Sequence, residues 1–322
     1  MKKKISIVVP MYNEEPVVDA FFKSLYQTLD SIENYEFEIV TVNDGSKDAT
    51  LEHLKAHQKL NPEIVVVSLS RNFGHEPAVA AGLSVASGEA IIPMDADLQD
   101  PPSVIPLLIQ KWEEGYEVVN AKRVQRDKDT FLKRKTAEMF YRIIAKWSGK
   151  TKVPQNVGHF RLITRKVLDE VLKLGDVTRV FRVEVPFVGF KTAEVEYARP
   201  ERELGKTHYN YKSMTTLAED SIIITTTEPL RFSIKWSILF VFITALSSLS
   251  ELALFIVELC GINLGLNDVI LMSWLIINVI LFAATFIMAS IAIQSLYISR
   301  AFKEAQKRPF FIIDEVIRNS KE

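Results

Sequence analysis

Three acidic side chains lie close together in the sequence and could bind a metal ion. Asp95, Asp97 and Asp100 follow the apolar run of residues 90–94, and two prolines come directly after them. This pattern predicts a buried strand that presents carboxylates at its tip. Because the carboxylates repel one another, a hard divalent cation would stabilise them, and Mg²⁺ and Mn²⁺ prefer oxygen ligands and often carry substrate phosphates. A solvated acidic turn is the alternative.

The elements that would position these acids alternate between strand and helix over residues 1–120. Apolar, β-branched runs predict strands, and apolar residues at helical spacing predict helices. Strands are expected at residues 5–9, 37–42, 64–69, 90–94 and 118–120, and helices at 16–29, 49–60 and 77–86. Strands this apolar, separated by helices, indicate a mostly parallel sheet covered on both faces. The expected fold class is therefore α/β.

Polar side chains follow four of these strands, at the point where each strand ends. They are Asn13 and Glu14, then Asn43, Asp44 and Ser46, then Arg71 and Asn72, and finally Asp95 and Asp97. In parallel α/β sheets, ligands bind beyond the carboxyl ends of the strands. We expect these side chains to line one edge of the sheet and to form a binding site there.

Two long apolar segments near the C-terminus predict a membrane anchor. Residues 236–259 are mostly apolar but contain Glu251 and Glu258, whereas residues 269–298 carry no charge. A helix crosses the bilayer core with about 20 apolar residues. Lys and Arg flank the two segments on the outside and are absent from the turn between them, so the positive-inside rule places both flanks in the cytoplasm. A buried helical hairpin of a soluble protein is the alternative.

The composition argues against several classes of protein. The net charge of −1 disfavours a general nucleic-acid binder, and the single cysteine, Cys260, permits neither an internal disulfide framework nor a zinc cluster. The apolar run at residues 5–9 is too short for a signal peptide, so the soluble part is expected to stay in the cytoplasm. A chain of 322 residues has room for one sizeable domain and a membrane hairpin.

Four motifs resemble those of family 2 glycosyltransferases. They are VVPMYNEE at residues 8–15, VNDGS at 42–46, RNFGH at 71–75 and DADLQDPP at 95–102. More narrowly, the chain resembles the polyprenyl-phosphate glycosyltransferases, which include dolichol-phosphate mannose synthase and the bactoprenol glucosyltransferases. The similarity continues through residues 158–162 and 205–207 and includes the two C-terminal spans. It implies a GT-A fold, a nucleotide-sugar donor, Mg²⁺ or Mn²⁺, and a lipid-phosphate acceptor.

The resemblance assigns residues to the donor. By position in the motifs, Pro10, Tyr12 and Glu14 would border the base and ribose of the nucleotide. Asp44 would hold the uracil or ribose side, and Arg71 would also bind the donor. For Tyr12, a packed aromatic ring at a strand end is an equally good interpretation.

The resemblance also assigns the metal and a loop that would close over the donor. Asp95, Asp97 and Gln99 would serve the metal and the donor diphosphate. The metal would act as a Lewis acid, because the leaving nucleotide gains negative charge. Lys206 follows Gly205 on a loop that could cover the donor, and a mobile surface turn is the alternative there.

A basic segment with an apolar face follows the last of these strands. Residues 131–147 combine Lys and Arg with aromatic and aliphatic residues, which suits a helix lying on an anionic membrane surface. By the resemblance, Arg123 and Arg134 would hold the lipid phosphate, and the arginine fork binds phosphate oxygens in pairs. A solvated basic helix is the alternative.

One residue departs from the family pattern. Relatives usually carry Asp where this chain has His159, and that Asp is often considered the catalytic carboxylate. Two interpretations compete. In the first, the activity is impaired or the acceptor differs. In the second, the reaction does not require a base at this position. We favour the last interpretation, because a phosphomonoester is mostly dianionic at neutral pH and can attack without losing a proton to the enzyme. His159, grouped with Asp95 and Asp97 as a candidate catalytic residue, would then contact a phosphate or be a polar loop residue.

The expected organisation has four parts. Residues 1–211 form a GT-A domain, 212–231 an interfacial juxtamembrane segment, 232–300 a two-helix transmembrane hairpin, and 301–322 a cytoplasmic tail. The protein would lie in the inner (plasma) membrane with its catalytic domain in the cytoplasm. A homo-oligomer is expected, because short hairpin anchors commonly associate.

The predicted function is metal-dependent, inverting transfer of a hexose or N-acetylhexosamine from a UDP-sugar to undecaprenyl phosphate. The β-linked product would serve cell-envelope modification. Two alternatives stay open. One is a catalytically weak membrane scaffold that binds nucleotide sugar or a partner synthase. The other is transfer to a glycan hydroxyl, which would need a general base.

Overall fold

The structure is a computed structural model that describes residues 2–124, 154, 156–174, 179–198, 238–239, 242, 246, 257 and 268–319. The chain divides into two compact units. The first comprises residues 1–221 and 307–322, and the second comprises residues 222–306.

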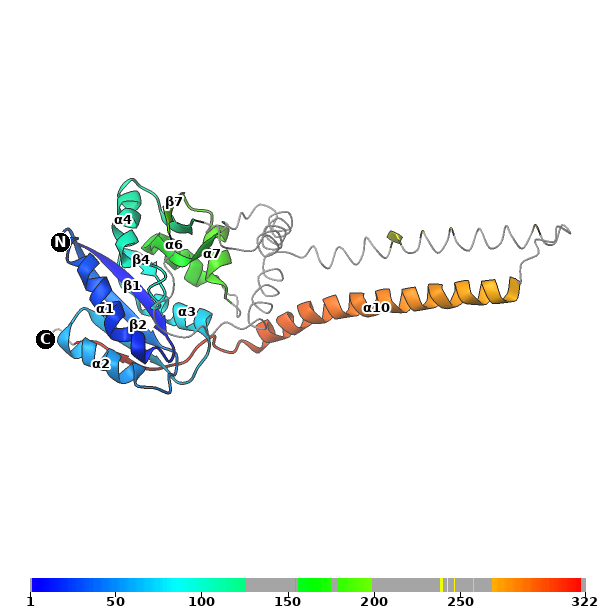
Figure 1. Ribbon diagram of the computed structural model, residues 1–322, viewed down its shortest axis with the longest axis horizontal. Coiled ribbons are helices and arrows are strands. Elements are labelled where there is room, and N and C mark those ends of the chain that lie inside the picture. The colour runs from blue at the N-terminus through cyan, green and yellow to red at the C-terminus, as the bar shows by residue number, and fades with distance from the viewer. Residues whose placement is uncertain are drawn as a thin grey trace. The chain divides into compact units, whose positions relative to one another are not determined.

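The first unit is built on an eight-stranded sheet in the order β7-β5-β6-β4-β1-β2-β3-β8. Figure 1 labels β1, β2, β4 and β7 of this sheet. The strands are β1 (Lys3–Met11), β2 (Tyr35–Asn43), β3 (Ile64–Leu69), β4 (Ala90–Pro93), β5 (Val118–Arg123), β6 (Val157–Thr164), β7 (Thr192–Tyr197) and β8 (Ile313–Ile317). The helices are α1 (Glu15–Leu29), α2 (Thr50–Leu60), α3 (His75–Val85), α4 (Ile105–Glu113), which follows the 3₁₀ turn Pro102–Val104, α6 (Arg165–Lys173) and α7 (Phe181–Phe187).

Alternate side chains of β1 enter two different cores. Ile5, Ile7 and Val9 pack in one core with apolar residues of α1, α2 and α4. Val8 packs in the other core, to which α3, α6 and α7 contribute. Both sets are completely buried, as expected for strands that are covered on both faces. This burial explains why the strands read as continuous apolar runs in the sequence.

The α/β fold with a mostly parallel sheet is confirmed. β1 is parallel to β2 and β4, β2 to β3, and β5 to β7. β6 is antiparallel to β4 and β5, and β8 is antiparallel to β3. Neither antiparallel strand was predicted from the apolar pattern of the sequence. His159 and Arg161 interrupt the apolar pattern of β6, and β8 is only five residues long with two acids.

Strand β8 belongs to the segment that was expected to be a cytoplasmic tail. It pairs Ile317 with Val66 and Ile313 with Leu69, and Ser70 donates a backbone hydrogen bond to Ile312 (3.0 Å). Lys55 of α2 forms an ion pair with Glu315. The strand therefore covers the free edge of β3, which would otherwise expose unpaired backbone groups.

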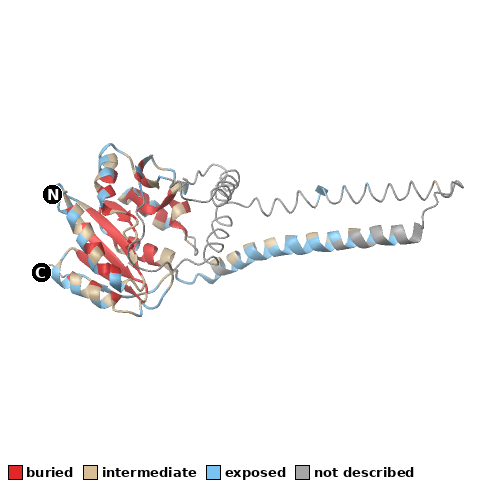
Figure 2. Cartoon of the chain, viewed as in Figure 1, coloured by how far each residue is buried: buried red, intermediate tan, exposed pale blue. Residues whose placement is uncertain are grey.

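The second unit contains helix α10 (Asp268–Gln306), which includes the second predicted span. Among the described residues, Phe282–Gln306 is one helical stretch long and apolar enough to cross a membrane. Its large apolar side chains, such as Ile287, Ile291 and Ile298, are exposed (Figure 2). The first predicted span, residues 236–259, lies outside the described residues except for isolated helical positions.

Candidate active site

The predicted site residues gather at one edge of the sheet. In the parallel strands, Met11 is paired with Asn43, Asn43 with Ser68, and Val8 with Pro93. The carboxyl ends of β1 to β4 therefore lie next to one another, and the loops that follow them meet. The expectation of a single polar edge is confirmed.

The loops after β1 and β2 hold each other in place. The backbone N–H of Asn13 donates to Ser46 Oγ (3.0 Å), and the N–H of Lys47 donates to Asn13 Oδ1 (2.8 Å). Asn13 has a left-handed φ of 52°, which Asn tolerates better than most residues. Tyr12 and Glu14 flank this residue and are half-buried, as is Pro10. The proposed donor-binding residues of this loop thus have a fixed backbone.

Asp44 connects the second loop to the third. Its carboxylate accepts hydrogen bonds from the backbone N–H groups of Phe73 (2.7 Å) and Gly74 (3.0 Å), and from Asn72 Nδ2 (3.0 Å). Burial raises the pKa of Asp44 to about 6, although these donors favour the ionised form. Asp44 thus holds the loop after β3, a role that the sequence analysis did not identify.

Gly45 allows these loops to approach closely. Its φ is +63°, and a Cβ placed there would lie 2.4 Å from the carbonyl carbon of Arg71. The Arg71 side chain is exposed, donates to the carbonyl oxygen of Asn72 (2.9 Å) and lies 4.0 Å from the ring centroid of Phe73. Arg71 therefore belongs to the same edge as Asp44.

The three acids of the central motif have different surroundings. Asp97 is buried, and its Oδ1 accepts the backbone N–H of Gln99 (3.1 Å). Asp95 is half-buried, and its Oδ1 lies 3.6 Å from Nε2 of His75. Asp100 is completely buried and contacts Arg123 and Tyr197. Asp95 and Asp97 therefore remain as the carboxylates of the edge, whereas Asp100 contributes to the packing of the loop.

The residues present fit a metal ion that a substrate helps to bind. Among the described residues, no three His, Cys, Asp or Glu side chains gather to hold a metal. Asp95, Asp97 and Gln99 offer only oxygen ligands that suit a hard cation. Mg²⁺ is usually bound by one or two carboxylates together with substrate phosphates. Two carboxylates at this edge match such a site.

Arg123 is fixed next to the acid loop. Its Nε donates to Tyr197 Oη (3.0 Å) and its Nη2 to Asp100 (3.3 Å). Burial disfavours its charge, but Asp100 and Tyr197 raise the pKa of Arg123 above its usual range. A Cβ at Gly158 would lie 2.9 Å from Nη2, so the guanidinium packs against this glycine. Arg134 and Lys206, the other predicted basic residues, lie outside the described residues.

His159 lies on strand β6 and is buried, so the interpretation as a loop residue is wrong. Its Nε2 lies 3.1 Å from Oε1 of Glu76, and its ring meets the ring of His75 edge-on with centroids 4.8 Å apart. Glu76 was not among the predicted site residues. An acid in the first turn of a helix such as α3 is common for reasons of helix stability alone, so its type and position carried no functional signal.

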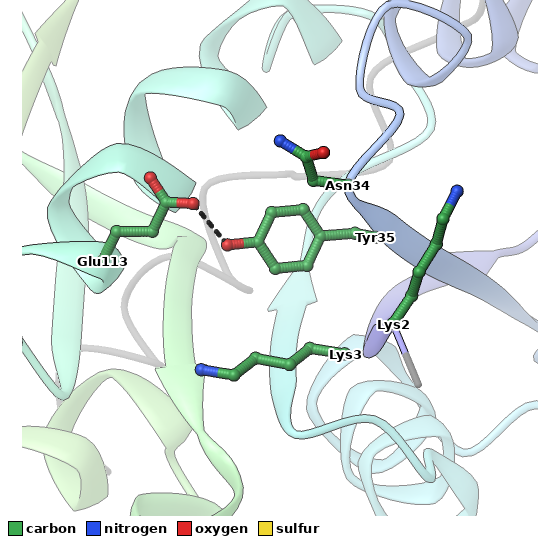
Figure 3. Close-up of a pocket in the computed structure, with 5 residues that line it drawn as sticks. All are labelled: Lys2, Lys3, Asn34, Tyr35 and Glu113. Carbon is green, nitrogen blue, oxygen red and sulfur yellow. Dashed lines mark hydrogen bonds between the residues drawn. The ribbon is translucent and has the colours of Figure 1, made fainter.

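A surface hollow of about 610 Å³ lies away from this edge. It is lined by Lys2, Lys3, Asn34, Tyr35 and Glu113, and Tyr35 Oη donates to Glu113 (2.6 Å; Figure 3). Lys3 and Tyr35 begin β1 and β2, so the hollow lies at the amino ends of the parallel strands. It is distinct from the candidate active site.

Comparison with known proteins identifies the family to which this chain belongs. Residues 6–172 match the family described as Glycosyl transferase family 2. The chain is 41% identical over 313 residues to a "Prophage bactoprenol glucosyl transferase homolog" of Escherichia coli (strain K12), covering 97% of this chain and 99% of that protein. It is 40% identical over 317 residues to the "Bactoprenol glucosyl transferase" of Shigella phage SfII, covering 98% and 99%.

A solved structure shares the fold. The "Crystal Structure of a Mycobacterial Protein" aligns with a TM-score of 0.50 at 18% identity, covering 69% of this chain and 73% of that chain. This likeness agrees with a GT-A-like α/β domain. The matched family and the near-full-length relatives confirm the resemblance inferred from the motifs. The chain belongs to glycosyl transferase family 2.

Proposed function

We propose that this protein is a membrane-anchored enzyme that transfers a sugar from a UDP-sugar to undecaprenyl phosphate. The observation that carries the proposal is the placement of Asp95 and Asp97 beside the loops after β1, β2 and β3 in a family 2 glycosyltransferase. The names of the near-full-length relatives support a polyprenyl phosphate as acceptor. A hexose or an N-acetylhexosamine is the proposed sugar.

The donor would bind across the joined loops. Pro10, Tyr12 and Glu14 would border the base and ribose, and Asp44 would act there together with Arg71. The hydrogen bonds between the loops support this proposal, because a binding edge with a fixed backbone loses little entropy when a ligand binds. Lys206 is proposed from the sequence alone.

Asp95, Asp97 and Gln99 would hold Mg²⁺ or Mn²⁺ and the donor diphosphate. When bound, the metal stabilises the negative charge of the departing UDP. An oxygen of the acceptor phosphate forms a bond to the anomeric carbon while the bond from that carbon to UDP breaks. An attack from the face opposite UDP inverts the anomeric carbon and gives a β-linked product from an α-linked donor. The dianionic acceptor has no proton to lose in this step.

Arg123 would bind the acceptor phosphate, with Arg134 as a second cation. The contacts of Arg123 with Asp100 and Tyr197 support this role, because they hold a charged guanidinium at a defined place. A guanidinium that is already ordered loses less side-chain entropy when it binds a phosphate.

Chain connectivity supports the two-span anchor. The chain leaves the first unit after residue 221 and returns to it at residue 307, and β8 joins the same sheet as β1. A segment that begins and ends in one domain crosses a bilayer an even number of times. With α10 as one span, residues 236–259 would provide the other, as a hairpin in the inner membrane with the domain in the cytoplasm.

A catalytically weak scaffold is the second candidate, and His159 is the observation that favours it. The two functions are separated by a transfer assay with the full-length protein in detergent. UDP- and GDP-sugars would be offered with undecaprenyl phosphate in the presence of Mg²⁺, Mn²⁺ or EDTA. We expect a lipid-linked product from one UDP-sugar that disappears with EDTA. If the protein binds nucleotide but forms no product from any donor, the proposed transferase function is wrong and the scaffold function is supported.

A further inference from the structure

Glu76 and His159 form a buried pair that joins α3 to β6. Oε1 of Glu76 lies 3.1 Å from Nε2 of His159, whose side chain is 6% exposed. Oε2 of Glu76 accepts a hydrogen bond from the backbone N–H of Phe181 (3.3 Å), and the Phe181 ring stacks near the imidazole. Both carboxylate oxygens thus have partners, and the orientation of the imidazole is fixed.

Nδ1 of His159 is the other nitrogen of this imidazole. It is buried and has no hydrogen-bond partner within the part of the chain that the structure describes. Most buried polar atoms in proteins have a partner, so an exception points to a bound molecule that supplies one. Because Nε2 faces Glu76, Nδ1 is the nitrogen through which His159 can bind a substrate.

His75 connects this pair to the acid loop. The rings of His75 and His159 have centroids 4.8 Å apart, and Nε2 of His75 lies 3.6 Å from Oδ1 of Asp95. A single side chain therefore separates His159 from a carboxylate of the proposed metal and diphosphate site. In the proposed reaction, the phosphates of both substrates meet at this edge.

The surroundings of Glu76 favour the ionised form of its carboxylate. Burial alone would raise its pKa, but the attraction and hydrogen bond of His159, together with His75 and Arg182, lower the pKa of Glu76 to about 2. A buried carboxylate is stable only with such partners. A ring nitrogen that carries a proton donates a hydrogen bond, and phosphate oxygens accept one.

We propose that Glu76 is a positioning residue that orients His159 so that Nδ1 donates a hydrogen bond to a substrate phosphate oxygen. The inference rests on the proposed function, because that function brings the phosphates to the acid edge. The phosphate belongs to the donor diphosphate or to the acceptor, and both present the same oxygen chemistry to His159.

The test compares Glu76→Gln, Glu76→Asp and His159→Ala, and the double variant Glu76→Gln/His159→Ala, in the full-length protein. Mutating the hydrogen-bond partner of a metal-binding His commonly lowers affinity or activity by about 10- to 100-fold, and this range guides the expectation for His159. We expect Glu76→Gln to lower kcat/KM by about 10-fold and Glu76→Asp to restore part of it. Glu76→Gln should have no further effect in the His159→Ala background, because its action passes through His159.

The kinetic constants identify the phosphate. A change in KM for undecaprenyl phosphate with unchanged UDP binding assigns Nδ1 to the acceptor, and weaker UDP binding assigns it to the donor. Glu38→Gln is the matched control. Glu38 is also buried and accepts hydrogen bonds from Ser6 and Ser87, and it lies on the amino-terminal half of β2. Its loss should lower the unfolding temperature and leave the kinetic constants unchanged.

Two outcomes would overturn the inference. One is a Glu76→Gln protein with wild-type kinetic constants. The other is a loss of kcat/KM from Glu76→Gln that is as large in the His159→Ala background as in the wild type. If Glu76→Gln does not fold, Glu76→Asp alone and in the His159→Ala background provides the same comparison. A wild-type protein that forms no lipid product refutes the proposed function instead, so the two failures are distinguishable.

Discussion

Oδ1 of Asp100 lies 3.3 Å from Nη2 of Arg123, and the Asp100 side chain is completely buried. The third acid of the central motif is therefore a partner of an arginine, while Asp95 and Asp97 lie at the sheet edge. Substitutions within these six residues should therefore differ in effect: a change at Asp100 should mainly alter stability, and a change at Asp97 should mainly alter activity.

Asp100→Asn should destabilise the protein more than it affects metal binding. Removing the buried carboxylate leaves the partly buried guanidinium of Arg123 without its anionic partner, at a cost of about 2 kcal/mol. Thermal unfolding in detergent would measure it. Glu114→Gln is the control, because Glu114 pairs with Lys111 on the surface, and solvent-exposed pairs contribute little to stability. Equal effects of the two substitutions would contradict the buried pair.

Asp97→Asn should abolish most of the transfer with little loss of stability. Losing a metal-binding carboxylate removes several kcal/mol of transition-state stabilisation, which corresponds to about 100-fold or more in rate. Initial rates at increasing Mn²⁺ concentration would show a higher metal requirement. Gln99→Ala, which removes a neutral oxygen, should have a smaller effect. A wild-type metal profile for Asp97→Asn would exclude this residue as a ligand.

Gly45→Ala should weaken nucleotide binding as well as stability. Its Cβ would meet the backbone of Arg71 and push apart two loops of the donor edge. Gly115 offers a matched control, because it also has a positive φ (+88°) but nothing lies within 4 Å of its Cβ. Gly115→Ala should cost only the conformational strain, about 1 kcal/mol. Calorimetric titration with UDP would distinguish the two, and equal UDP affinity would refute the role of the loop contact.

The contribution of Asp44 to the stability of the domain should fall as the pH rises from about 4 to about 6. Burial raises the pKa of Asp44 to about 6 in the folded chain, whereas its ordinary value is 3.8. The folded state therefore holds a proton in this range that the unfolded state has lost, and this contribution is lost as the pH passes the folded value. Unfolding temperatures of the wild type and Asp44→Asn would be compared across this range. Parallel curves would show that Asp44 does not cause the dependence.

Removal of residues 307–322 should destabilise the first unit and promote aggregation. It deletes β8 and exposes the edge of β3 along four residue pairs. Removal of residues 320–322, which follow the last described residue, serves as the control. Unfolding temperature and size-exclusion profiles would report the difference. A long truncation that behaves like the short one would show that β8 is dispensable.

The sequence was sufficient for the parts of the fold that have a repeated pattern. The runs at β1, β2, β3 and β4 are apolar on both faces, so they identified buried parallel strands and located the polar edge. β6 was not predicted, because His159 and Arg161 are buried there at positions where the pattern leads one to expect apolar residues. β8 was not predicted, because its pairing with β3 comes from the distant end of the chain.

The candidate site could be proposed from the sequence where its residues lie in one motif. Asp95, Asp97 and Gln99 come from one loop, so their spacing alone suggests the hypothesis of a metal site. The contacts of Asp44 with Phe73, and of Glu76 with His159, join separate segments of the chain. Residue type carries no information about such contacts, because the same acids are common in loops and in first helical turns.

The position of β8 has a consequence for biosynthesis. β3 is complete at residue 69, but its partner strand begins at residue 313, after α10. Because the chain emerges from the ribosome N-terminus first, the edge of β3 stays unpaired during nearly all of translation. The last strand of the sheet can pair only after the apolar helix has been synthesised. Pairing of β8 with β3 therefore depends on prior synthesis of α10, so a covered β3 edge is found only in a chain whose apolar helix has already been made.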